Sequence, residues 1–276
     1  EYIHGGVSRN VVEDIANIEL RPTFVGIVDD SALGEDVVKK LKNHKVNTDY
    51  VMTMPGGMGT WLAVFDHNGD LAGSISQRPN LMPILGLLEE KGDEIFANAD
   101  SVIVEVDMDK DIIKKVVALA KQYNKKLYGV VSNMSIAVER RDFLKHFDCF
   151  ICNQLEAGML FMEDYADKSP EELRDILSKR VILGKIPAMI VTMGGNGAVY
   201  ADVNGEKGIC PPQRVRVKDT TGAGDAFCAG VASGLTYGKT LSEAVEIGSR
   251  LAASVITSSE NVCPRFLPEE FGITLD

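Results

Sequence analysis

Apolar, strand-like runs alternate with amphipathic helical segments along most of this chain, and that alternation restricts the fold more than any other feature. The run 101–106 is apolar except for Glu105, which is typical of a strand buried on both faces. Apolar residues recur at helical spacing in the segment that follows, 109–122. Further strands are expected at 24–28, 127–131, 149–152 and 188–192, and further helices at 34–43, 222–235 and 241–258. This order predicts an α/β fold with a mainly parallel central sheet and helices on both faces.

Two segments break the alternation. Residues 48–76 read as two or three antiparallel strands with Asn68-Gly69 as a hairpin turn. Because such a small sheet does not fit inside the core, it is expected to form a β lid. Residues 199–217 also read as short β structure, with a turn at Asn204-Gly205. The sequence therefore predicts an α/β core made of residues 1–47 and 77–276, and a lid made of residues 48–76.

The segment Asp219-Thr220-Thr221-Gly222-Ala223-Gly224-Asp225-Ala226-Phe227 places small residues at the expected start of a helix. A helix that begins with Gly-Ala-Gly has accessible backbone N–H groups at its positive end and can receive an anion there. Asp225, beside such an anion, can be the base that takes a proton from a hydroxyl group. An anion hole formed by Gly222, Ala223 and Gly224 next to a carboxylate is what phosphoryl transfer to an alcohol requires.

These glycines also have a simpler interpretation, because small residues let a helix pack closely against a neighbour. In that case Asp225 would only complement the helix dipole. The segment is not a Walker A loop, since no Lys-Ser/Thr follows the glycines, and it lacks the Gly-x-Gly-x-x-Gly spacing of a dinucleotide-binding loop. Its length, and the Asp residues at positions 219 and 225, favour the anion site.

Three further motifs stand where a ligand would be bound. Gly5-Gly6 opens a helix and permits close approach to the backbone, and Asn10 can donate to and accept from sugar hydroxyls; a tight turn with an Asn cap is the alternative. Asn153-Gln154-Leu155-Glu156 follows a strand, at the sheet edge where ligands collect, although Glu156 can equally be half of a capping arrangement. The motif 192–197, Thr-Met-Gly-Gly-Asn-Gly, follows the next strand. The alternative to ligand binding there is a simple β-turn between two strands.

The 276-residue chain has a net charge of −11, which disfavours nucleic acid and anionic membranes as partners. No apolar run has the length of a membrane span, and no signal peptide is visible. An odd number of scattered cysteines, five in all, fits a reduced, cytoplasmic protein. Cys149-x-x-Cys152 leaves open a redox pair or half of a zinc site, but two small apolar thiols in a buried strand are favoured.

The segment around Asp225 is similar to the signature of the ribokinase (PfkB) family of sugar and nucleoside kinases, and the resemblance extends from Gly5 to about Pro264. It implies a ribokinase-like fold, ATP-dependent phosphorylation of a hydroxyl on a small-molecule sugar or nucleoside, and Asp225 as the catalytic base. A K⁺ requirement and a homodimer formed through the lid strands are implied by resemblance only. The implied contacts are Gly5, Gly6 and Asn10 for the acceptor, Asn153, Thr192, Gly194 and Gly197 for ATP, and Glu156 for Mg²⁺ through water.

Within this family the chain looks most like pseudouridine kinases. The resemblance lies in the opening Gly5–Asn10, in the lid segment 60–66, where Thr60 is expected to contact the acceptor, and in Val131-Ser132. Two departures are Ser76-Gln77-Arg78, where Asn-Asp-Met is expected, and Glu19-Leu20, which replaces the usual Leu-Gly. The family also implies an acidic acceptor contact on a strand before the Gly-Gly loop, and no residue here can be assigned to it.

We therefore expect phosphorylation of pseudouridine to pseudouridine 5′-phosphate as the first candidate activity. A sugar kinase of the ribokinase or fructokinase type is the second. A sugar- or nucleotide-binding regulator without turnover on the same fold is the third, since a fold does not determine function. Retention of Asp225 and its glycines argues against the regulator.

Overall fold

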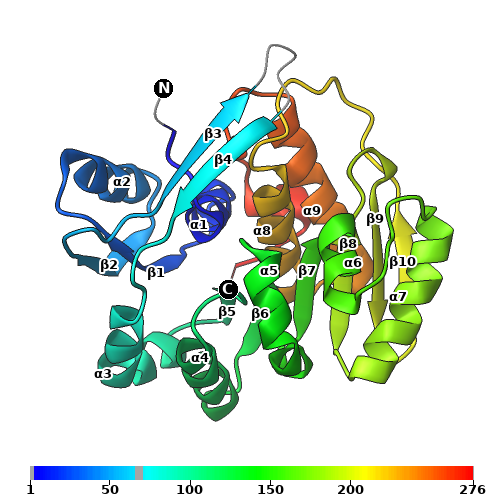
Figure 1. Cartoon of the computed structure of the whole chain (residues 1–276), viewed down its shortest axis with the longest axis horizontal. Coiled ribbons are helices and arrows are strands. Elements are labelled where there is room, and N and C mark those ends of the chain that lie inside the picture. Colours follow the sequence, from blue (N-terminus) through cyan, green and yellow to red (C-terminus); the bar gives the residue numbers. More distant parts are fainter. Residues whose placement is uncertain (1–2, 66–70, 276) are drawn as a thin grey trace.

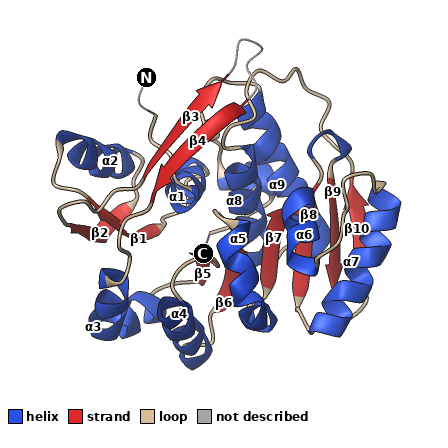
Figure 2. Ribbon diagram, viewed as in Figure 1, coloured by secondary structure: helices blue, strands red, loops and turns tan. Residues whose placement is uncertain are grey.

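The central sheet has six strands in the computed structural model, which describes residues 3–65 and 71–275 (Figures 1 and 2). The strand order is β10-β9-β8-β7-β6-β5. Strands β5 to β8 are parallel, whereas β9 is antiparallel to both β8 and β10. The bounds are β5 (Ser101–Glu105), β6 (Lys126–Val130), β7 (Cys149–Asn153), β8 (Ala188–Thr192), β9 (Ala198–Asp202) and β10 (Lys207–Cys210). The mainly parallel sheet expected from the sequence is confirmed.

Helices cover both faces of this sheet, as the alternation predicted (Figure 2). Phe150 and Met189 point to one face, and their neighbours Ile151 and Ile190 point to the other. The first face packs against α3 (Pro83–Ala97), α4 (Lys110–Gln122), α6 (Gln154–Phe161) and α7 (Pro170–Gly184). The second face packs against α1 (Val7–Asn17), α8 (Ala223–Thr236) and α9 (Leu241–Ile256). Within 3–65 and 71–275, no helix combines the length and the apolar character needed to cross a membrane.

Shorter helical segments lie in the connections. They are α5 (Met134–Ala137), η1 (Val138–His146), η2 (Gly194–Asn196) and η3 (Pro268–Phe271). Strands β9 and β10 confirm the short β structure predicted after residue 198, and Gly205 in the turn between them has a φ of 98°. The β structure ends at Cys210, so the predicted range to residue 217 was too long.

Strands β1 (Thr23–Val28) and β2 (Asn47–Thr53) form a separate parallel pair. Helix α2 (Ala32–Asn43) connects them, and it supplies the crossover that parallel neighbours require. The prediction that residues 48–76 are all antiparallel was therefore wrong for β2, because the preceding helix returns the chain in the parallel direction.

Strands β3 (Thr60–Phe65) and β4 (Leu71–Gln77) form the antiparallel pair expected for a lid. They extend beyond the central sheet (Figures 1 and 2). The predicted turn at Asn68-Gly69 lies outside the described residues. The division of the chain into a core of 1–47 and 77–276 and a lid of 48–76 stays a prediction.

Candidate active site

Helix α8 begins with backbone groups that are open to a ligand. Its N-cap residue, Gly222, has a φ of 81°, and no side chain caps the helix. A Cβ at this position would lie 2.0 Å from the carbonyl oxygen of Asn261, so both the conformation and the space require glycine. A Cβ at Gly224, in contrast, would meet no heavy atom within 4 Å. The helix therefore presents Gly224 to open space while Gly222 is fixed against the loop that follows α9.

The amides of this first turn are not equivalent. The N–H of Ala223 donates to the carbonyl of Thr220 at 3.2 Å. In the described part of the chain, the N–H groups of Gly222 and Gly224 have no protein acceptor. Of the three amides predicted to bind an anion, those of Gly222 and Gly224 are thus free at the positive end of α8. Whether they bind a phosphoryl group stays a prediction.

Asp225 lies in this first turn, and its side chain is bound from the opposite end of the chain. The Nδ2 of Asn10, in α1, donates to Oδ2 of Asp225 at 2.6 Å. Burial, together with the nearby carboxylates Glu105 and Glu156, raises the pKa of Asp225 to about 7 against the opposing effects of Asn10 and Arg9. A carboxylate with a pKa near neutrality has the proton affinity of an effective general base.

The Gly5-Gly6 loop lies at the start of α1, next to the end of β5. Gly6 is the N-cap of the helix with a φ of 96°, and the carbonyl of Gly5 accepts from Arg9 Nε at 3.0 Å. Both the backbone N–H and the hydroxyl of Ser8 donate to Glu105 Oε1, at 3.0 and 2.7 Å. Burial raises the pKa of Glu105. Glu105 was not among the site residues predicted from the sequence, although a carboxylate that interrupts an apolar strand at its carboxyl end was a usable signal.

The lid is joined to the core just after the carboxyl end of β5, close in sequence to Glu105. Arg78, directly after β4, forms an ion pair with Asp107, whose side chain is fully buried. The other carboxylate oxygen of Asp107 accepts from the N–H of Ser132 at 2.9 Å. Thr60 is paired with Gln77, so it lies at the end of the lid that this ion pair holds. Arg78, which departs from the pattern of the resembled family, thus has a buried ionic partner, Asp107, that was not predicted from the sequence.

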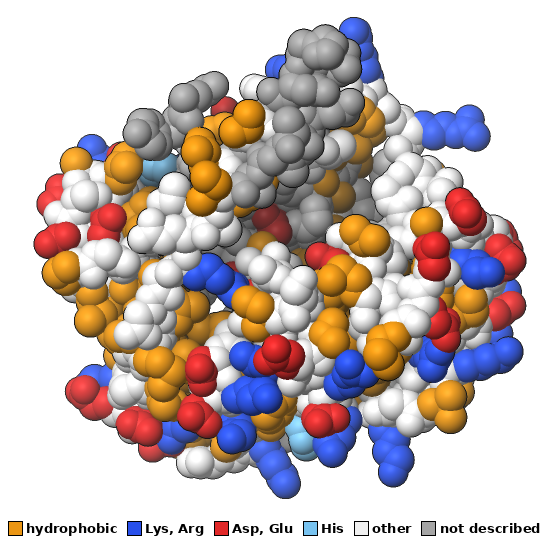
Figure 3. Space-filling model, in the orientation of Figure 1, with side chains coloured by type: hydrophobic (Ala, Val, Ile, Leu, Met, Phe, Trp, Pro, Cys, Tyr) orange, Lys and Arg blue, Asp and Glu red, His pale blue; other side chains and the backbone are white. Residues whose placement is uncertain are grey.

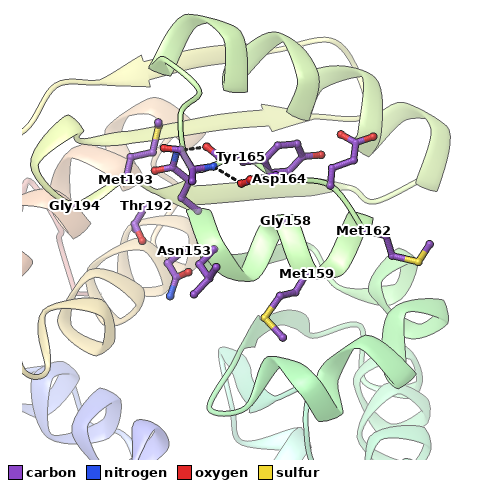
Figure 4. Close-up of a pocket in the computed structure, with 13 residues that line it drawn as sticks. Asn153, Gly158, Met159, Met162, Asp164, Tyr165, Thr192, Met193 and Gly194 are labelled. Atoms are coloured by element: carbon purple, nitrogen blue, oxygen red, sulfur yellow. Dashed lines mark hydrogen bonds between the residues drawn. The ribbon is translucent and has the colours of Figure 1, made fainter. Parts of the chain in front are cut away.

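Three of the four residues predicted to bind ATP line one pocket of about 850 Å³. Asn153 and Thr192 lie at one end of this pocket and Met162 at the other, with Gly194 beside Thr192 (Figure 4). Gly197 does not line it; a φ of 85° and a Cβ position 2.1 Å from the carbonyl oxygen of Cys210 make it a turn glycine. The space-filling view shows a hollow near the centre of this face of the molecule, with acidic side chains in it (Figure 3).

Asn153 and Glu156 form a complete capping box at the start of α6. Oδ1 of Asn153 accepts from the N–H of Glu156 at 2.9 Å, and Oε2 of Glu156 accepts from the N–H of Asn153 at 2.8 Å. The capping interpretation left open by the sequence is therefore correct. Burial raises the pKa of Glu156. The capping bonds leave Oε1 of Glu156 and Nδ2 of Asn153 for a ligand.

The described residues do not offer a cage for a metal ion. No group of three or more His, Cys, Asp or Glu side chains in 3–65 and 71–275 could hold one. Mg²⁺ bound by nucleotide phosphates keeps several waters and needs few protein ligands, so the free oxygen of Glu156 fits a water-mediated contact. Cys149 and Cys152 are free and buried in β7, and burial raises the pKa of both thiols. This environment suits small apolar side chains rather than reactive thiolates.

Comparison with known proteins identifies the family of this chain. A family model described as pfkB family carbohydrate kinase matches residues 1–263. A guanosine-inosine kinase from Exiguobacterium acetylicum is 35% identical over 268 residues, which cover 94% of this chain and 86% of the relative. Pseudouridine kinase from Escherichia coli (strain K12) is 23% identical over 268 residues, covering 93% of this chain and 81% of the relative.

The fold can be compared with a solved structure. Ribokinase from Arabidopsis thaliana, in complex with ribose and ATP, has a TM-score of 0.81 at 18% identity, covering 99% of this chain and 88% of that one. The predicted ribokinase-like fold is thereby confirmed. With the family match over residues 1–263, this chain belongs to the pfkB family of carbohydrate kinases, enzymes that transfer a phosphoryl group to a hydroxyl.

Proposed function

We propose that the protein transfers the γ-phosphoryl group of ATP to the 5′-hydroxyl of a nucleoside. The observation that carries this proposal is the position of Asp225, in the first turn of α8, next to two free amides and with a pKa raised to about 7. A general base and an anion site in one helical turn are the two elements that phosphoryl transfer to an alcohol needs.

The reaction is a direct displacement. Ionised Asp225 accepts the proton of the acceptor hydroxyl. The oxygen of that hydroxyl forms a bond to the γ-phosphorus at the same time. The bond between the γ-phosphorus and the bridging oxygen breaks, and ADP leaves with that electron pair. The N–H groups of Gly222 and Gly224 donate to the phosphoryl oxygens, where negative charge must be stabilised.

We assign the ATP phosphates to the strand ends that carry Asn153 and Thr192, with Gly194 and Gly197 in the adjoining turn. Glu156 would hold Mg²⁺ through water by its free carboxylate oxygen. When bound, the cation supplies positive charge that offsets the charge of the phosphates. A K⁺ requirement and a cytoplasmic location stay predictions from the sequence.

We assign the acceptor to the space bordered by the Gly5-Gly6 loop, Asn10 and Thr60. A relative named guanosine-inosine kinase is 35% identical to this chain, against 23% for a pseudouridine kinase. This difference favours purine nucleosides over pseudouridine as the first acceptors to test. A free sugar, as in a ribokinase or fructokinase, remains the second candidate, and a regulator without turnover is the third.

ADP release measures the activity directly. The protein is mixed with ATP, Mg²⁺ and one acceptor at a time from guanosine, inosine, pseudouridine, ribose and fructose. We expect release with at least one nucleoside, and phosphorylation at the 5′-oxygen by ³¹P NMR of the product. Release only with a free sugar would favour the second candidate, and no release with any acceptor would contradict the kinase assignment.

Asp225→Asn provides the matched variant, because it keeps the shape of the side chain and removes the base. We expect turnover to fall about 10³-fold while the melting temperature stays close to that of the parent protein. Turnover equal to that of the parent protein would exclude Asp225 as the base.

A further inference from the structure

We propose that Asn10 is a positioning residue, which holds one oxygen of the Asp225 carboxylate so that the other oxygen faces the acceptor hydroxyl. This role rests on the proposed function, because it concerns the base of that reaction. It differs from the acceptor contact that the sequence implied for Asn10. The hydrogen bond that carries it spans 215 positions of the sequence, from Asn10 Nδ2 to Asp225 Oδ2, at 2.6 Å.

The orientation of the Asn10 amide is fixed by its neighbours. Its Oδ1 accepts from Arg9 Nη2 and from Asn261 Nδ2, the latter at 3.3 Å. A guanidinium group can only donate, so the oxygen of the amide must face Arg9 and the nitrogen must face Asp225. The amide cannot rotate by 180° without placing its N–H₂ group against these two donors.

Arg9 is itself held from several directions. Its Nη2 donates to the carbonyl of His4 at 2.7 Å, its Nε donates to the carbonyl of Gly5, and Nη1 forms an ion pair with Glu13. Arg9 and Asn10 are both buried, with 6% and 5% of their surfaces exposed. The donor to Asp225 therefore belongs to a buried hydrogen-bond network that includes the Gly5-Gly6 loop.

The saturated oxygen of Asn10 limits what else this residue can do. With two donors on Oδ1 and one N–H group on Asp225, a single N–H group remains for a sugar hydroxyl. The hydrogen bond to Asp225 favours the ionised carboxylate, since a donor stabilises negative charge. Asn10 thus both orients the base and keeps it charged.

The charged groups around Asp225 act in both directions. Glu105 from β5 and Glu156 from α6 raise its pKa, and Arg9 from α1 lowers it. Asp14, also in α1, lies close enough for the two carboxylates to interact. Because burial and these carboxylates disfavour the charge on Asp225, loss of the Asn10 hydrogen bond moves the pKa of Asp225 upward.

The experiment compares Asn10→Ala and Asn10→Asp with Asn17→Ala. Asn17 is the matched control, because it is a buried amide of the same helix that bonds to Cys263 and His44 instead of Asp225. We expect the acidic limb of the kcat/KM profile to move up by about one pH unit in Asn10→Ala, which is about a fivefold loss at pH 7. In Asn10→Asp, the new carboxyl group beside Asp225 moves this limb further.

Asn17→Ala lowers the melting temperature but leaves the acidic limb in place. Asn10→Asp preserves the volume of the side chain, so it keeps the test valid if Asn10→Ala fails to fold. An acidic limb at its original position, with only the KM for the acceptor raised, would overturn the proposal and make Asn10 an acceptor contact.

A second readout does not require an acceptor. The pKa of Asp225 is measured by ¹³C NMR of the side-chain carboxyl carbons, with the signal assigned by its loss in Asp225→Asn. If the parent protein phosphorylates nothing, the proposed function fails, and the titration still tests the role of Asn10. A pKa of Asp225 that is the same with and without the Asn10 amide would contradict the positioning role.

Discussion

At the scale of single residues, the buried polar side chains of α1 set this structure apart from an ordinary core helix. Arg9, Asn10, Glu13, Asp14 and Asn17 are each less than 10% exposed. Most of their polar atoms have partners, such as the N–H of Cys263, which donates to Asp14 Oδ1 at 2.6 Å. Asp14 Oδ2 has no hydrogen-bond partner in 3–65 and 71–275. A carboxyl group in that position is most stable when it is neutral.

Asp14 should therefore make the protein less stable as the pH rises. Burial raises the pKa of Asp14 to about 8, above its value in the unfolded chain. The sign follows from linkage: the folded state binds the proton more tightly, so the stabilisation is complete below about pH 4 and is lost as the pH rises to about 8. Asp14→Asn, which is neutral at every pH, removes this loss, whose full extent is on the order of 5 kcal/mol.

Urea unfolding at pH 5 and at pH 8 measures the effect. We expect the free energy of unfolding to fall between these values in the parent protein, and to fall less in Asp14→Asn. Asp225 contributes a smaller change of the same sign, so some slope remains. An equal slope in the two proteins would show that Asp14 titrates at its ordinary pKa.

The sequence identified the residues that stand in motifs, but it could not identify those defined only by their surroundings. Asp225 and Gly222 were found because a helix start with small residues and a carboxylate is readable in one dimension. Glu105, Asp107 and Asn261 acquire their partners from elements far away in the sequence. For the same reason the bond between Asn10 and Asp225 could not be predicted, although both residues were selected.

At the scale of elements, the first turn of α8 combines a tightly packed glycine with an open one. Gly222 fits against the loop after α9, and Gly224 faces space. The close-packing interpretation is therefore correct for Gly222, whereas the anion interpretation stays a proposal for Gly224. One of them serves close packing, and the other leaves room for an anion.

Substitution by alanine should separate these two roles. Gly222→Ala places a Cβ 2.0 Å from a carbonyl oxygen and requires an unfavourable positive φ, so we expect it to lower the free energy of unfolding by more than about 1 kcal/mol. Gly224→Ala should leave stability unchanged or slightly higher, because alanine favours a helix. Its methyl group occupies the space assigned to the phosphoryl group, so its kcat/KM for ATP should fall.

Thermal unfolding and ATP kinetics on both variants make the comparison. If Gly224→Ala kept the full kcat/KM for ATP, the phosphoryl group could not lie where we assign it.

The element order itself was largely predictable, since strand and helix periodicities are local. The pairing of β2 with β1 was not, because the direction of a strand is set by the connection before it.

At the scale of the whole molecule, the lid presents an aliphatic face to solvent. Leu62 is paired with Ile75 across the two strands, and Val64 lies on the same face two residues further along. Their exposed fractions are 56%, 70% and 55%. Exposed apolar side chains gathered on one face of a thin sheet are typical of an interaction surface. We propose that this face forms the homodimer that the family resemblance implied.

Ile75→Glu tests that assembly. A charged side chain in an apolar interface is costly, so we expect the variant to sediment as a monomer at concentrations where the parent protein sediments as a dimer. Ser76→Glu is the control, because Ser76 is exposed on the opposite face of the same strand. A parent protein that is itself monomeric, or an Ile75→Glu variant that remains dimeric, would contradict the proposed interface.

The bond between Asn10 and Asp225 has a consequence for how the enzyme comes into being. During synthesis on a ribosome the amide emerges first, and the carboxylate it must hold emerges 215 residues later. The backbone N–H of Cys263, which donates to Asp14, emerges 249 residues after Asp14. A nascent chain can therefore fold its central strands while it remains unable to use ATP, and a proteolytic fragment that lacks either end should be inert.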